Sequence, residues 1–216
     1  MYLRFACYLL VGLLIGMALR EYARAFVATR LHDPTPRLWG RLTLHPRTWF
    51  DPFGSGLLPG LILVLWALNA SFLPPPVAYG KPAPVDPNYF RRGDRDVVYV
   101  SLAGPLLNLV LGVAAGLAIR AGLTGEGARL VIGFMLANFS LAFFHLTPIP
   151  GLDGARIVGL LLPPRAREVY RNADQYLPLF ALVLLFVFAG PLLSIIYSLS
   201  NATCSFASGT PCLPLP

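Results

Sequence analysis

The chain has 216 residues, of which 56% are hydrophobic and only 12% are charged, and its mean hydropathy is +0.65. Soluble domains carry about twice this charged fraction, so the composition excludes an ordinary soluble protein and indicates an integral membrane protein. The net charge of +7 comes from basic residues dispersed among apolar segments, without a basic helix interleaved with aromatic residues, and this argues against nucleic-acid binding. It fits loops that lie on the cytoplasmic side or touch anionic lipid.

The first apolar run, Phe5–Thr29, predicts a helix that can cross a bilayer, which takes roughly 20 residues. Its second half, "GMALREYARAFVATRL" at residues 16–31, places Arg20, Glu21 and Arg24 in apolar surroundings. The run also has the form of a signal peptide, with an A-x-A-like site at residues 23–25. Because the rest of the chain is itself multi-spanning, we expect the run to be retained as a helix.

Two irregular segments follow. Residues 40–46, "GRLTLHP", alternate apolar and polar side chains and predict a short β element. Residues 74–96, "PPPVAYGKPAPVDPNYFRRGDRD", are rich in proline and end in a charged cluster. Irregular backbone near membrane depth persists only where protein or a water-filled cavity covers it, so we expect both segments to line a site.

Four further runs reach membrane length, and one shorter apolar piece is expected to form a half-helix. The runs are Ser55–Leu73, Asp96–Ile119, Ala128–Leu146 and Tyr176–Leu199, and the short piece is Asp153–Leu162. The sequence therefore predicts an all-α membrane protein of five to six transmembrane or re-entrant helices, with a short β element between the first two. We expect one domain over residues 1–200 and a short tail over 201–216.

Orientation and disulfide formation stay open from the sequence. If the second run spans, the basic loops after the first and second runs lie on opposite sides of the membrane, so the positive-inside count is a tie. Cys204 and Cys212 can pair only if the tail faces an oxidising compartment.

Five motifs occur in an order that resembles the site-2 protease family of intramembrane zinc metalloproteases. They are Arg20-Glu21-Tyr22-Ala23-Arg24, the segment from "GRLTLHP" to "DPFG", Gly80-Lys81-Pro82-Ala83-Pro84-Val85, "SLAGPLLNLVLG" at 101–112 and "LTPIPGLDGARI" at 146–157. The resemblance covers about residues 10–160. In that family a helical His-Glu-x-x-His supplies two zinc ligands and a general base, and a later Leu-Asp-Gly supplies an aspartate ligand.

The resemblance aligns Glu21 with the general base and Asp153 with the aspartate ligand, but Arg20 and Arg24 stand at both histidine positions. Zinc needs ligands with a lone pair, whereas arginine stays protonated and offers only donors. Our hypothesis is that the two guanidinium groups replace the charge of the metal and clamp both carboxylates. The simpler alternative is that the charges snorkel to the membrane interface, with Glu21 and Arg24 as an ordinary i,i+3 pair.

Other polar residues of the motifs have weaker assignments. His145 is a possible substitute zinc ligand, although a polar histidine at a helix contact is the simpler interpretation. Asn108 lies on a helix that packs near the site in the family, and Pro148 and Pro150 break the chain before Asp153.

We therefore expect a catalytically inactive pseudoprotease that binds a transmembrane segment or a partner protein. The alternative is an active intramembrane zinc metalloprotease with unusual ligands. No cofactor is expected under the first interpretation and zinc under the second. The expected partners are the lipid bilayer and a transmembrane helix or peptide of another membrane protein, not nucleic acid. The expected location is the bacterial cytoplasmic membrane, as a multi-pass protein.

Overall fold

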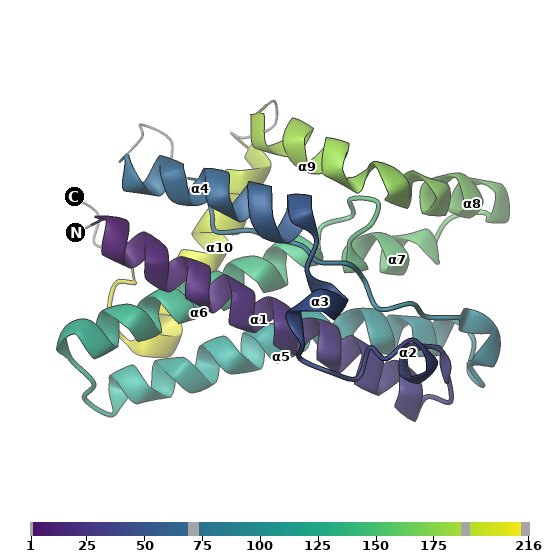
Figure 1. Cartoon of the computed structure of the whole chain (residues 1–216), viewed down its shortest axis with the longest axis horizontal. Coiled ribbons are helices and arrows are strands. Elements are labelled where there is room, and N and C mark those ends of the chain that lie inside the picture. Colours follow the sequence, from purple (N-terminus) through teal and green to yellow (C-terminus); the bar gives the residue numbers. More distant parts are fainter. Residues whose placement is uncertain (1, 69–73, 187–190, 213–216) are drawn as a thin grey trace.

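The computed structural model describes residues 2–68, 74–186 and 191–212, and within these ranges the chain forms helices and irregular segments (Figure 1). The α-helices are α1 (Tyr2–Arg30), α2 (Thr35–Leu38), α3 (Pro46–Trp49), α4 (Leu58–Ala67), α5 (Asp94–Arg120), α6 (Gly125–His145), α7 (Asp153–Gly159), α8 (Pro164–Asn172), α9 (Leu177–Phe186) and α10 (Pro191–Ser208). A π-helical turn, η1 (Pro52–Leu57), precedes α4, and two 3₁₀ turns are η2 (Pro87–Tyr89) and η3 (Ala173–Tyr176).

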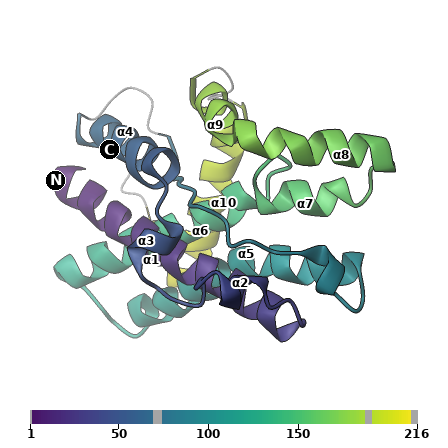
Figure 2. The ribbon, with the colours of Figure 1, turned by 45° about the vertical axis from the view of Figure 1, so that its right-hand side comes forward.

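Three helices of the described chain, α1, α5 and α6, are long and apolar enough to cross a membrane. They run side by side and pack on one another (Figures 1 and 2). Glycines allow the close approach of α1 to α6, since a Cβ added at Gly12 would lie 2.8 Å from Cα of Phe134. Leu13, Met17 and Leu141 are buried between the helices. The protein is thus a helical membrane protein.

The predicted β element between the first two apolar runs is wrong, because the described residues contain no strand and residues 40–45 form a turn and an irregular bend that lead into α3. Gly40 has a φ of +62°, and the Arg41 N–H donates to the Pro36 carbonyl at 2.8 Å. Trp49 Nε1 donates to the Leu44 carbonyl at 3.1 Å. These local contacts use the polar groups that a strand would offer to a neighbour, so the alternating pattern does not produce a sheet.

The second predicted run does not cross the membrane as one long helix in the described chain. The α4 helix has 10 residues, about half of what a span needs. The chain then returns to the beginning of the run in an extended segment, residues 74–86. In this segment the Tyr79 N–H donates to the Gly54 carbonyl at 3.0 Å, and the Lys81 N–H donates to the Trp49 carbonyl at 2.8 Å. The described residues on either side of the gap at 69–73 thus lie side by side: residues 74–81 return to the place beside the middle of α1 where α4 begins.

The last predicted run is divided between α9 and α10, and residues 187–190 lie outside the described ranges. Helix α10 packs against α5 and α6. At its end a disulfide joins Cys204 to Cys212, with their Cα atoms 5.9 Å apart. The Arg120 side chain donates to the carbonyls of Phe206 and Ala207 and so ties the end of α5 to the same segment.

Candidate functional site

Four charged side chains meet near the C-terminal end of α1, in the interior of the protein. They are Arg20, Glu21 and Arg24 of α1 and Asp153 at the first residue of α7. Each is at most 5% exposed. The structure thus brings together residues that are 133 positions apart in the sequence. We call these four residues the ionic cluster.

Each arginine of the ionic cluster contacts both carboxylates. Arg20 lies 2.5 Å from Oε1 of Glu21 and also donates to Oδ2 of Asp153. Arg24 Nη1 lies 3.3 Å from Oε2 of Glu21, and its Nε lies 3.1 Å from Oδ1 of Asp153. The second of these is an ion pair without hydrogen-bond alignment, since Arg24 Nε makes no hydrogen bond. Two cations and two anions balance, which offsets the cost of burying each charge.

Asp153 owes its charged state to this arrangement. Burial alone raises the pKa of a carboxyl group, but Arg24 and Arg20 act in the opposite direction and hold the pKa of Asp153 below its usual value. Arg156, one turn further along α7, is an additional cation beside the cluster. Burial and Arg24 lower the pKa of Arg156 to about 10.

The extended segment 74–86 crosses the ionic cluster. Its residues 74–80 are all buried, and the Ala83 N–H donates to Oε2 of Glu21 at 3.1 Å. The Asp86 N–H then donates to Asp33 beyond the end of α1 at 2.9 Å. The sequence indicated that this segment lines a site, but the contact of Ala83 was missed, because a backbone donor leaves no signal in the residue type.

Helix α5 makes room for the arginine side chains at Gly104. A Cβ added at Gly104 would lie 3.0 Å from Cγ of Arg20. Asn108, one turn later, is fully buried, and neither atom of its amide finds a hydrogen-bond partner among the described residues. The structure therefore places Asn108 in the interior of the bundle without a hydrogen bond to the ionic cluster.

His145 lies at the end of α6, fully buried and close enough to Asp153 to interact with it electrostatically. Its Nδ1 lies 2.9 Å from the Leu141 carbonyl, so Nδ1 carries the hydrogen and Nε2 keeps its lone pair. Nε2 has no hydrogen-bond partner among the described residues. His145 therefore keeps a ring nitrogen that could ligate a metal ion.

The break after α6 brings α7 against the end of the preceding helix. Pro148 is exposed and Pro150 is half-buried, so neither is part of the buried ionic cluster itself. The closest approach is at Gly154, where an added Cβ would lie 2.1 Å from the Leu146 carbonyl oxygen. No side chain fits between these backbones, so Gly154 permits the position of Asp153.

Substituting Gly154 by alanine is therefore expected to displace α7 and to destabilise the protein by about 3 kcal/mol or more, as for overpacking against backbone. The measurement is the thermal unfolding midpoint in detergent. Gly60→Ala in α4 is the matched control: an added Cβ there meets nothing within 4 Å, so the variant should be unchanged or slightly more stable. Equal midpoints for Gly154→Ala and the unmodified protein would contradict the tight packing.

The ionic cluster offers zinc no ligand set as it stands. Arg20 and Arg24 provide only N–H donors, and both carboxylates already bind these donors. In the described part of the chain, no group of three or more His, Cys, Asp and Glu side chains gathers in a way that could hold a metal ion. Two neighbouring guanidinium groups would also repel a divalent cation.

Together, the membrane-length helices and the buried charges at their shared end define a membrane protein with an intramembrane polar site. The chain is 32% identical over 206 residues to YwhC of Bacillus subtilis (strain 168), which is provisionally named a zinc metalloprotease, and the match covers 90% of this chain and 86% of YwhC. It is also 32% identical to Rip2 of Mycobacterium tuberculosis, named in the same way, over 81% of this chain and 65% of Rip2. This chain belongs to their family, the site-2-protease-like zinc metalloproteases.

No protein-family model matches the chain, and no solved structure matches it.

Proposed function

We propose that this protein is a pseudoprotease of its family: it does not hydrolyse peptide bonds but binds a transmembrane segment of another protein. The observation that carries the proposal is the set of ion pairs in the ionic cluster. Glu21 aligns with the family's general base, and in this chain its carboxylate contacts Arg20, Arg24 and the Ala83 N–H. A general base must reach a water molecule, and these three contacts engage both carboxylate oxygens and take up three of their roughly four acceptor positions.

In this protein the two arginines take the electrostatic place that a divalent metal holds in a working site. Arg20 and Arg24 contribute two positive charges, which balance Glu21 and Asp153. The bundle therefore keeps α7 docked on α1 without a metal. A pseudoprotease of this kind retains the shape of the family fold and loses its chemistry.

The part of the proposal that concerns binding is supported by an apolar cleft between α1 and α4. It is shallow, with only about 10 Å³ of free space, and is lined by Leu9, Leu10, Leu13, Pro59, Ile62 and Leu63, among others. The cleft is too small to take up a whole side chain, but its apolar lining matches the surface of a transmembrane segment that packs over it. Replacing Leu10 by a photoreactive amino acid is expected to yield adducts with the membrane-spanning part of a partner. The same replacement at exposed Leu117 of α5 is the control. Equal labelling at both positions would contradict a docking role for the cleft.

The experiment that tests the loss of chemistry is a measurement of zinc per chain in purified protein, before and after mild chelation. We expect far less than one zinc per chain and no change in the unfolding midpoint on chelation. Near-stoichiometric zinc that Asp153→Ala abolishes would overturn the proposal.

The second candidate function is an active protease with unusual ligands, and the free Nε2 of His145 favours it. The names of the relatives point in the same direction. Under this alternative, His145→Ala would lose the metal together with Asp153→Ala. If the unmodified protein binds no zinc, the active-protease alternative is excluded and the pseudoprotease proposal stands.

A further inference from the structure

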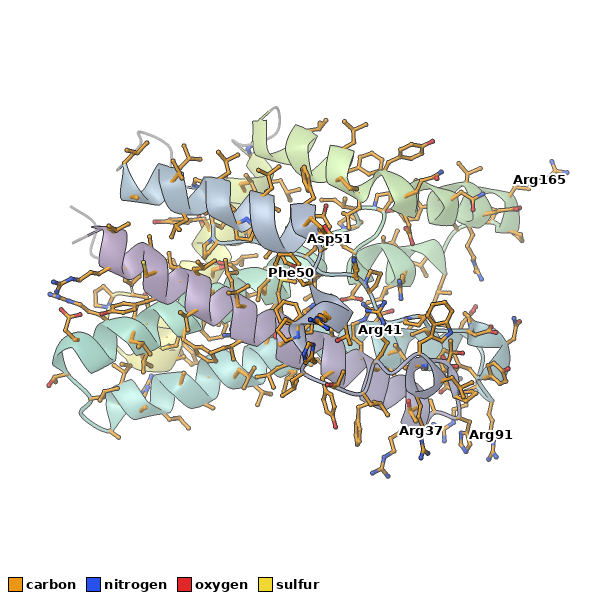
Figure 3. The ribbon with its side chains drawn as sticks, viewed as in Figure 1. Arg37, Arg41, Phe50, Asp51, Arg91 and Arg165 are labelled. Atoms are coloured by element: carbon orange, nitrogen blue, oxygen red, sulfur yellow. A yellow bond between two sulfur atoms is a disulfide. The ribbon has the colours of Figure 1, made fainter. Side chains whose placement is uncertain are left out.

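The basic side chains outside the ionic cluster gather at one end of the helix bundle. Helix α1 ends there and α5 begins there, because these two long helices run in opposite directions (Figure 1). The loops at this end carry exposed cations, and Figure 3 shows several of them projecting from it. We call this the basic end; its exposed cations include Arg37, Arg91, Arg92, Arg95 and Arg165.

The return of residues 79–81 to the side of Gly54 and Trp49 is what puts these cations together. If that segment spanned, the loop with Arg37 and the loop with Arg91 would lie on opposite sides of the membrane. Instead, Tyr79 and Lys81 hydrogen-bond beside Gly54 and Trp49, so both loops emerge at the same end. Helix α8 lies at the same end as these two loops, since the guanidinium group of its Arg167 lies 3.6 Å from the carboxylate of Asp94 at the beginning of α5.

The opposite end has few cations, and two of these have partners within the protein. Arg129 pairs with Glu126 at 2.7 Å, and Arg120 donates to the carbonyls of residues 206 and 207. This end also carries the disulfide between Cys204 and Cys212. Disulfides persist in oxidising compartments, and loops rich in lysine and arginine stay on the cytoplasmic side. The two observations are independent and give the same orientation.

The basic end also exposes apolar and aromatic side chains among its cations. Trp39 is 69% exposed, Leu38 79% and Tyr89 51%. Tryptophan and tyrosine favour the level of the lipid headgroups, and arginine beside them binds anionic headgroups. A surface that mixes these types fits a membrane interface better than a soluble acidic partner.

We propose that the basic end lies at the cytoplasmic leaflet and binds anionic phospholipid headgroups, while the disulfide end lies across the membrane. This orientation places the ionic cluster toward the cytoplasmic side, since Arg20 and Arg24 belong to the half of α1 that leads to the basic end. The proposal does not depend on whether the protein is a protease.

The orientation is tested with single cysteines in the full chain after Cys7, the free cysteine of the described residues, is replaced by alanine. Arg91→Cys reports the basic end and Thr124→Cys the opposite end, and both positions are exposed. A membrane-impermeant maleimide applied to intact spheroplasts should label Thr124→Cys, and Arg91→Cys only after permeabilisation. The reverse pattern, or labelling of both from outside, would overturn the orientation.

Lipid binding is tested with purified protein and a fluorescent phosphatidylglycerol in neutral detergent. The Arg91→Gln/Arg165→Gln variant is expected to bind the lipid several-fold more weakly than the unmodified protein, with a shallower dependence on salt. The matched control is Arg4→Gln/Arg129→Gln, which removes the same charge from the opposite end and should bind as the unmodified protein does. Equal weakening in both variants would reduce the effect to net charge and overturn the assignment of the surface.

Discussion

Replacing both arginines of the ionic cluster by histidine is expected to create a zinc site at the positions of Arg20 and Arg24. In Arg20→His/Arg24→His, two imidazoles stand at i and i+4 on one helix face, beside Glu21 and Asp153. Histidine and aspartate are ordinary zinc ligands, and the incoming dication replaces the two positive charges that the substitutions remove. We expect zinc to rise from far below one to about one ion per chain.

The readout does not require activity. Because zinc binds the folded state, added zinc should raise the unfolding midpoint of the double-histidine variant, and a chelator should lower it. Arg20→Gln/Arg24→Gln is the matched control: it loses the same charge without gaining ligands, so zinc should not stabilise it. A folded double-histidine variant that binds no zinc would show that these positions do not correspond to the ligand positions of the family.

Removing one arginine of the ionic cluster is expected to destabilise the protein strongly. Arg24→Ala leaves two buried carboxylates with a single guanidinium, and breaking a buried pair in this way costs about 3–5 kcal/mol. The measurement is the unfolding midpoint in detergent, with Arg37→Ala at the exposed loop as the control, which should change little. An unchanged midpoint for Arg24→Ala would contradict the clamp.

A double-mutant cycle separates the ion pair from the loss of packing. Arg24→Ala/Asp153→Asn removes both partners, so its loss of stability should be smaller than the sum of the losses in the two single variants.

The stability that this ion pair contributes should also depend on pH. Since the pKa of Asp153 is lowered in the folded protein, the stability from this pair is present above about pH 4 and is lost as the pH falls through the folded pKa. The gap between Arg24→Ala and the unmodified protein should therefore narrow in acid.

Part of the fold followed from local pattern and part did not. The long apolar runs around residues 5–29, 96–119 and 128–146 correspond to α1, α5 and α6, because uninterrupted hydrophobicity over this length has one solution in a bilayer. The run that begins at Ser55 has the same composition, yet it forms a short helix followed by an extended return. Hydrophobicity alone does not distinguish a span from a re-entrant segment that neighbouring helices cover.

The predicted strand at residues 40–46 failed for a related reason. Alternation of apolar and polar side chains is necessary for a half-buried strand, but a strand also needs a partner, and Gly40 and Pro46 close the segment into a turn first. Similarly, Cys204 and Cys212 carried no sign of pairing beyond their presence in one tail, because pairing depends on how α10 ends.

The sequence by itself determined the membrane class, the motif order of the family and the charge balance of Arg20, Glu21, Arg24 and Asp153, since residue type alone decides which groups can bind a metal and which can only donate. Only the tertiary structure decided which carboxylate meets which guanidinium, that Ala83 reaches Glu21, and that both basic loops emerge at one end. Those features depend on contacts between segments far apart in the chain, and such contacts form when helices pack and the chain turns back on itself.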